Sequence, residues 1–81
     1  MRRIELEYPI TVGGETIKAV TLRRPTAGDL RAMDKAKGGD VDKGITLLLR
    51  LVQEDMTPEQ VDAMDVKDFR AASEVVADFL A

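Results

Sequence analysis

The feature that most constrains the fold is a change in hydrophobic period about a quarter of the way along the chain. Over residues 3–12 apolar and polar residues alternate, whereas from residue 26 onwards the apolar residues recur at helical spacing. A period of two places one apolar face on a β-strand, and a period of about 3.6 places one on an α-helix. The sequence therefore predicts an α+β fold, with an N-terminal β-hairpin followed by three to four α-helices in a small helical bundle.

The predicted hairpin occupies the first 22 residues. One face of its first strand carries Ile4, Leu6, Tyr8, Ile10 and Val12. Gly13 and Gly14 predict the turn, because glycine reaches positive φ without steric cost. A second strand is expected over residues 16–22. Pro9 has no N–H to donate, so the first strand should have an open edge at that point.

The two strands of the hairpin can pair in two registers. A two-residue loop would pair Leu6 with Thr21, which turns apolar residues of the second strand to the opposite face. A three-residue loop through Glu15 instead pairs Leu6 with Leu22 and keeps the apolar residues together. We therefore favour the three-residue loop.

The segment after the second strand resembles a strand exit followed by a helix start. Pro25 ends the strand, and Thr26 with Asp29 three residues later predicts an N-cap and a capping-box-like pair. A first helix is expected from Ala27 to Ala36, with Leu30 and Met33 facing inward. The residues of this structural motif are Arg23, Arg24, Pro25, Thr26, Gly28 and Asp29.

A second helix is predicted over residues 40–54, with Asp40 as its N-cap. Its polar side chains fall in a sector of about 120°, which leaves an apolar arc of about 200°, roughly twice the width that one-sided packing requires. Two explanations stay open: the helix is central and contacted from two sides, or part of the arc binds a partner. Leu47 and Leu51 are the candidate partner-binding residues on this helix.

Two more helices are predicted in the last third of the chain. Thr57, Pro58 and Gln60 supply an N-cap, a first helical residue and a capping-box partner for a short helix that ends near Met64. Asp65 then begins a final helix that reaches Leu80. Its expected core face consists of Val66, Phe69, Ala72, Val76, Ala77 and Leu80. Val75 and Phe79 lie on the flank of that face and complete the candidate partner-binding set.

Composition restricts the chemistry. We expect the 81 residues to form one domain, with a hairpin part over 1–24 and a helical part over 26–81. There is no cysteine and no histidine, which removes thiolate metal sites and the side chain best suited to acid–base catalysis near neutral pH. No phosphate-binding or calcium-binding loop occurs. The sequence thus predicts a protein that is not an enzyme and has no catalytic residues, metal ligands or cofactors.

Charge is distributed unevenly along the chain. Residues 1–37 have eight basic and five acidic residues, whereas residues 38–81 have four basic and ten acidic residues. The acidic half argues against general nucleic-acid binding. The alternative function is a small nucleic-acid-binding regulator that uses Arg23, Arg24 and Arg31. No signal peptide and no apolar stretch near the roughly 18 residues of a membrane span occur, so we expect a soluble, intracellular protein.

Several segments occur in an order that resembles a known family. They are the turn Val12–Glu15, the stretch Val20–Leu30, the leucine-rich helix, and the segments Met56–Glu59 and Met64–Phe69. The most specific piece is the run from Leu22 to Leu30, Leu-Arg-Arg-Pro-Thr-Ala-Gly-Asp-Leu. Together they resemble the tail assembly chaperones of Mu-like and P2-like long-tailed bacteriophages.

The resemblance implies a partner and a place of action. A member of this family would bind the tape measure protein, a long helical and apolar chain, and keep it soluble while the tail tube is assembled. It would act in the cytoplasm of the bacterial host and would be absent from the mature virion. A longer, frameshifted form of the same protein and a homo-oligomer are further expected partners, whereas membrane and nucleic acid are not.

Overall fold

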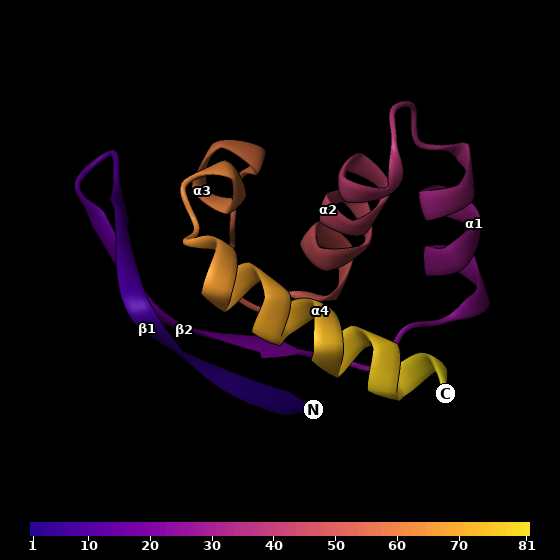
Figure 1. The fold of residues 1–81 in the computed structure, drawn as a ribbon, viewed down its shortest axis with the longest axis horizontal. Helices are drawn as coiled ribbons and strands as arrows, with labels where there is room; N and C mark the ends of the chain where they lie inside the picture. The colour runs from indigo at the N-terminus through magenta and orange to yellow at the C-terminus, as the bar shows by residue number, and fades with distance from the viewer.

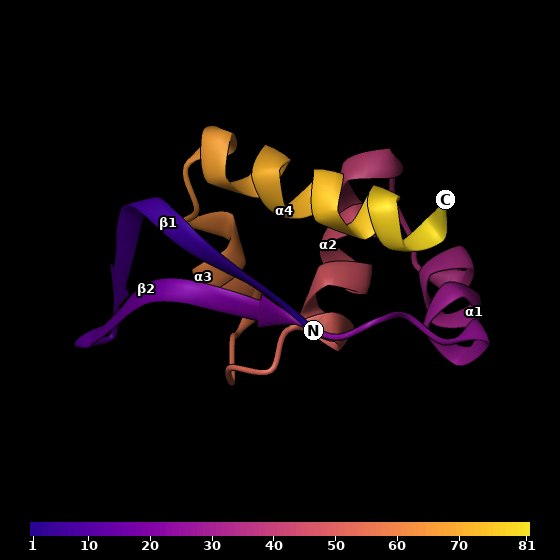
Figure 2. The ribbon, with the colours of Figure 1, turned by 90° about the horizontal axis from the view of Figure 1, so that it is seen from below.

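The computed structural model describes all 81 residues, and it consists of a curved β-hairpin with four helices on its inner side (Figure 1). The elements are β1 (Arg2–Val12), β2 (Glu15–Leu22), α1 (Ala27–Lys35), α2 (Asp40–Leu51), α3 (Pro58–Asp62) and α4 (Val66–Leu80). In both Figure 1 and Figure 2, α2 lies between α1 and α3, and α4 runs across them along the hairpin. The predicted α+β fold is confirmed.

The hairpin closes through a two-residue turn. Gly13 has a φ of 62° and Gly14 a φ of 83°, which are left-handed conformations that favour glycine. Val12 pairs with Glu15 across this turn. The predicted three-residue loop through Glu15 is therefore wrong, because Glu15 already belongs to the strand.

A large bulge in β1 shifts the register beyond the turn. Between the pairs Ile10 with Ile17 and Glu5 with Ala19, residues 6–9 of β1 face a single residue of β2. At the open end of the hairpin the register has moved, so neither of the two registers compared above holds along its whole length. The bulge includes Pro9, which has no N–H for the ladder.

A carboxylate from α4 replaces the missing strand partner at this bulge. The backbone N–H groups of Glu7 and Tyr8 each donate to the Asp68 carboxylate, at 2.9 Å. Asp68 is 4% exposed, so it is a buried anchor between α4 and β1. Its side chain satisfies two backbone donors that the bulge leaves unpaired, which explains why an aspartate is buried at this position.

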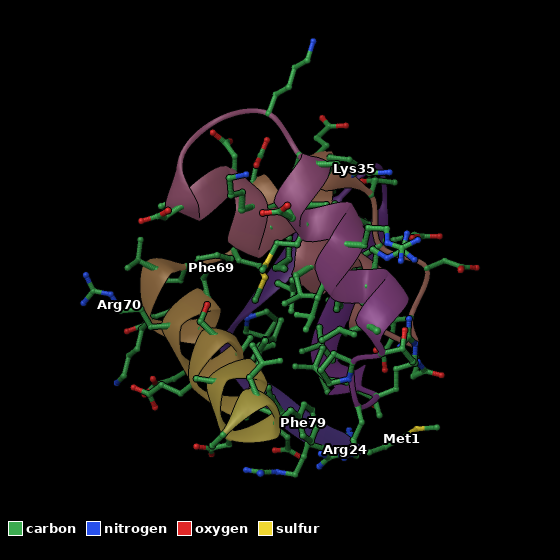
Figure 3. The ribbon with its side chains drawn as sticks, turned by 90° about the vertical axis from the view of Figure 1, so that its right-hand side faces the viewer. Met1, Arg24, Lys35, Phe69, Arg70 and Phe79 are labelled. Carbon is green, nitrogen blue, oxygen red and sulfur yellow. The ribbon has the colours of Figure 1, made fainter.

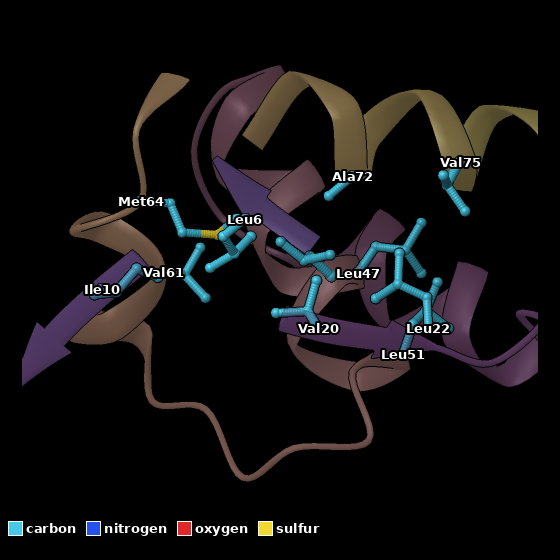
Figure 4. Close-up of a cluster of buried hydrophobic side chains, with 11 residues drawn as sticks. Leu6, Ile10, Val20, Leu22, Leu47, Leu51, Val61, Met64, Ala72 and Val75 are labelled. Carbon is cyan, nitrogen blue, oxygen red and sulfur yellow. The ribbon is translucent and has the colours of Figure 1, made fainter. Parts of the chain in front are cut away.

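The core lies between the inner face of the hairpin and the helices (Figure 4). Its eleven buried side chains are Leu6, Ile10, Val20, Leu22, Leu47, Leu48, Leu51, Val61, Met64, Ala72 and Val75. Tyr8, which was expected on the same face, is 53% exposed because the bulge turns it away. Leu30 on α1 is also exposed, so only half-buried Met33 of the predicted inward pair packs against the core.

α2 ends three residues before the predicted boundary because the chain turns into an edge contact with β2. Val52 forms an isolated bridge with Leu22, and the N–H of Gln53 donates to the Thr21 carbonyl at 2.8 Å. The Glu54 carboxylate accepts the Thr21 N–H at 2.7 Å. Because residues 52–54 form these contacts with β2, the helix does not continue for another turn. The same contacts cover part of the free edge of β2. At the other end of α2 the N-cap is Gly39, not the predicted Asp40.

The buried face of α4 differs from the predicted one. Asp68, Ala72 and Val75 are buried, whereas Val66 and Leu80 are 60% and 48% exposed. The predicted core stripe is confirmed at Ala72 and at half-buried Phe69 and Val76, which pack against the core, and it is wrong at Val66 and Leu80. Asp68 reaches the bulge, and Val75 turns inward with it. The predicted caps of α3 and α4 are confirmed: Thr57 forms a capping box with Gln60, and Asp65 accepts the N–H of Lys67 at 2.9 Å.

Candidate partner-binding groove

An open apolar groove of about 370 Å³ lies between α1, α2 and α4. Met33 lines it from α1, and the other ten lining residues come from the two longer helices: Asp40, Val41, Gly44, Leu47, Leu48, Phe69, Ser73, Val76, Ala77 and Leu80. The exposed side chains at this groove include Val41, at 66%, and Leu80, at 48%. Contiguous exposed apolar surface of this kind is typical of a protein–protein contact.

A second, smaller hollow of about 160 Å³ adjoins the groove. It lies between α2, α3 and the start of α4, and it shares Val41 and Phe69 with the first. Figure 3 shows Phe69 pointing from α4 toward the other helices, and Arg70 pointing away from them. The two hollows therefore form one apolar surface along the N-terminal half of α2.

The groove exists because its walls contain small side chains. Gly44 on α2 and both Ser73 and Ala77 on α4 leave room where larger residues would close the gap. A methyl group at Gly44 would have no heavy atom within 4 Å. Glycine inside a helix is less favourable than alanine by about 1 kcal/mol, so this position gives up helix stability and keeps the groove open.

Gly44→Ala should stabilise the protein. The methyl group adds helix propensity worth about 1 kcal/mol and meets open space, so we expect the melting temperature to rise by about 4–8 °C. Thermal unfolding followed by circular dichroism checks this. An unchanged or lower melting temperature would contradict the assignment of Gly44 to an open groove wall. Gly38→Ala provides the contrasting variant, since Gly38 has a φ of 107° and should lose stability.

Asp29 joins α1 to α2 and to the segment that follows β2. Its carboxylate accepts two hydrogen bonds from the Arg23 guanidinium (2.7 and 2.9 Å), one from Arg50 (2.9 Å) and one from the Thr26 N–H (2.8 Å). Asp29 is 1% exposed. The predicted capping box with Thr26 is confirmed. These donors, with Arg23 first and the Thr26 N–H next, hold the pKa of the Asp29 carboxyl far below its usual value.

Comparison with known proteins shows to which family the chain belongs. Residues 3–81 match the family described as phage tail assembly chaperone proteins, E, or 41 or 14. The chain belongs to this family. It is 34% identical over 79 residues to tail assembly protein E of Escherichia phage P2, which covers 95% of this chain and 87% of that protein. It is equally similar to tail assembly protein E′ of the same phage, of which it spans only 56%. No solved structure matches the chain.

In this tail assembly chaperone, three of the four predicted partner-binding residues are buried next to the groove and not exposed in it. Leu47, Leu51 and Val75 are 2%, 0% and 8% exposed, so they pack in the core, and Leu47 also forms part of the groove floor. Phe79 is half-buried and lies under the Arg24 guanidinium, 5.4 Å from its ring centre (Figure 3). The prediction that Val75 is exposed is wrong.

Each of the two explanations for the wide apolar arc of α2 applies to one half of this helix. Its C-terminal half is buried against the hairpin and the other helices, whereas Val41 and half-buried Ile45 line the two hollows at its N-terminal half. Val41, Val76 and Leu80 line the groove but were not among the predicted partner-binding residues. The proximity of Val41 to Gly44 at the uncovered end of an over-wide arc was the available signal.

The structure does not favour the nucleic-acid alternative for this tail assembly chaperone. The Arg23 guanidinium is held by the Asp29 carboxylate, and Arg24 donates to the Phe79 carbonyl at 3.5 Å. Of the three proposed arginines, only exposed Arg31 has no such contact, and one cation gives a weak phosphate surface. No group of acidic side chains is close enough to hold a metal ion, and no helix has the length and hydropathy to cross a membrane.

Proposed function

We propose that this tail assembly chaperone binds the tape measure protein and keeps it soluble while the tail is assembled. The observation that carries the proposal is the open apolar groove between α1, α2 and α4 in a member of this family. A chain that must wait in solution for a tube to form around it needs its apolar helices covered. A groove with exposed apolar walls can cover one face of such a helix.

The exposed groove residues could supply useful binding energy. Complete burial of an aliphatic side chain contributes about 1.5–3 kcal/mol, and Val41 and Leu80 are each about half exposed or more. Covering both therefore contributes roughly 2 kcal/mol, which corresponds to more than a tenfold change in affinity. The side chains of the groove floor, such as Leu47 and Leu48, add van der Waals contacts and are already buried in the free chain.

Co-expression with the neighbouring tape measure protein tests this function. We expect the wild-type chain to co-purify with the tape measure protein and to raise its soluble yield. The variant Val41→Ser/Leu80→Ser should weaken the complex about tenfold or more, because it makes the groove rim polar without adding charge. Circular dichroism should show that this variant stays folded, since both residues are exposed.

A matched control removes an exposed apolar side chain elsewhere. Tyr8→Ser acts on the bulge of β1, outside both hollows, and should leave the complex intact. The proposed function would be rejected if the wild-type chain neither co-purified with the tape measure protein nor increased its soluble yield. Equal weakening by the control and the groove variant would show that the groove is not the contact.

We also propose that the protein acts in the cytoplasm of the host and is absent from the mature virion. Tail assembly protein E′ matches the same length of this chain as protein E but is longer, which supports a longer form made by frameshifting here as well. The coding DNA downstream should then contain a slippery site and an overlapping frame. A mass measurement in solution tests for a homo-oligomer.

A further inference from the structure

The residues that line the groove indicate the charge of the partner segment that binds there. This inference rests on the proposed function. The charged residues that line the two hollows are Asp40 in the first and Asp62 in the second. No lysine or arginine lines either hollow. The charged part of the groove surface is therefore entirely acidic.

Most basic side chains of residues 38–81 have partners within the chain. Residues 38–81 contain four basic and ten acidic residues. Three of the basic ones have internal partners: Lys43 donates to the carbonyls of Asp34 and Ala36, Arg50 donates to Asp29, and Lys67 pairs with Glu7. Arg70 points away from the helices that form the groove (Figure 3). None of these four side chains lines either hollow, and the exposed cations Arg31 and Lys35 lie on α1, so the acidic side of the groove is the one formed by α2, α3 and α4.

The sizes of the hollows fit a short row of apolar side chains. A cavity of about 150 Å³ holds one benzene ring, so the larger hollow of about 370 Å³ has room for roughly two large side chains and the smaller, of about 160 Å³, for one. Because the hollows adjoin at Val41 and Phe69, these side chains would lie in a row. A helix presents such a row at positions i, i+4 and i+7.

We propose that the groove binds an amphipathic α-helix of the partner whose apolar face is bordered by lysine and arginine. The apolar face fills the two hollows, and the basic residues lie beside Asp40 and Asp62. Opposite charges on the two surfaces speed encounter and select the partner. A second copy of this chain that bound through the same face would bring like charge to the groove, because residues 38–81 carry a balance of −6.

Two synthetic peptides test the proposal against the full chain. Both are about 15 residues long, because shorter helices are marginal in water, and both carry Leu, Leu and Phe at positions i, i+4 and i+7. One has lysine and arginine beside these anchors, and the other has glutamate at the same positions. Binding is measured by fluorescence anisotropy at low and high salt, with the wild-type chain, with Asp40→Asn/Asp62→Asn, and with Gly44→Leu.

We expect the basic peptide to bind about tenfold more tightly than the acidic one at low salt. This ratio should shrink in high salt and in Asp40→Asn/Asp62→Asn, whereas Gly44→Leu should weaken both peptides because its side chain fills the groove. Equal or tighter binding of the acidic peptide, no binding of either peptide, or binding unchanged by Gly44→Leu would overturn the proposal. So would a Gly44→Leu variant that dissociates a dimer, since a second copy would then occupy the groove.

The two proposals fail in distinguishable ways. If the tape measure protein co-purifies through Val41 and Leu80 but the peptides show no charge preference, the inference about charge fails and the proposed function stands. If the basic peptide binds as expected but the tape measure protein does not co-purify, the proposed function fails while the groove retains its preference for a basic helix.

Discussion

Asp29→Ala is expected to destabilise the protein by about 3 kcal/mol. The substitution removes a buried acceptor that receives hydrogen bonds from Arg23, Arg50 and Thr26, and with it the capping box of α1. The two guanidinium groups are 33% and 46% exposed and can turn toward water, which limits the loss. For 81 residues, total stability is of the order of 4–12 kcal/mol, so the change removes a large part of it.

Urea unfolding followed by circular dichroism measures this loss. Asp34→Ala is the matched control, since it removes an exposed aspartate from the same helix and should change stability by less than about 0.5 kcal/mol. Asp29→Asn should lie close to Asp29→Ala, because an amide cannot accept from both guanidinium groups and the backbone N–H together. If Asp29→Ala and Asp34→Ala unfold at the same urea concentration, Asp29 does not hold the three elements together.

The same carboxylate makes stability depend on pH in the acid range. Because the folded-state pKa of Asp29 is lowered by Arg23 and the Thr26 N–H, the folded state binds this proton less readily than the unfolded state. The contribution of Asp29 is fully present above the pKa of an unfolded aspartate, about 3.9, and is lost as pH falls below it toward the folded-state value. The free energy of unfolding, measured with urea between about pH 5 and pH 2, should therefore decrease less as pH falls in Asp29→Asn than in the wild type.

Asp68→Ala is expected to cost about 2–3 kcal/mol. It leaves the N–H groups of Glu7 and Tyr8 without their acceptor inside a bulge where β2 offers none. It also removes a buried link between α4 and β1, which are joined as well by the exposed pair of Lys67 with Glu7. Amide hydrogen exchange should become faster at Glu7 and Tyr8 before it does so elsewhere in the hairpin.

Two variants separate this role from a loss of charge. Asp55→Ala removes an exposed aspartate from the loop before α3 and should leave stability unchanged. Asp68→Asn keeps one acceptor oxygen but turns an amide N–H toward the other backbone donor, so it should fall between the wild type and Asp68→Ala. Unchanged exchange at Glu7 and Tyr8 in Asp68→Ala would show that water or another group satisfies these donors.

The features that the sequence predicted correctly all depend on neighbours within one turn of chain. In the capping boxes of Thr26 with Asp29 and of Thr57 with Gln60, the two partners are three positions apart. The paired glycines at 13 and 14 form their own turn. Such interactions have the same partners in any fold that contains the helix or the turn, so their residue types predict them. The order of strands and helices followed for the same reason.

The candidate groove was predicted only in part because its position depends on which face of each helix is covered. The over-wide arc of α2 indicated apolar surface to spare, but the sequence could not show that its C-terminal half is buried while Val41 remains exposed. Leu80 was assigned to the core and is exposed at the groove, whereas Phe69 and Val76 pack against the core as predicted and also line the groove. Val75 was assigned to the surface and is buried.

The sequence by itself determined the α+β class, the starts of α1, α3 and α4, and the likeness to tail assembly chaperones, because these depend on local periodicity, caps and residue order. The tertiary structure alone decided the hairpin register, the phase of α4 and the place of the groove. The reason is one contact between residues about 60 positions apart: Asp68 accepts the N–H groups of Glu7 and Tyr8. Hydrophobic patterns place an aspartate outside, so this buried polar contact rotates α4 in a way that apolar periodicity cannot reveal.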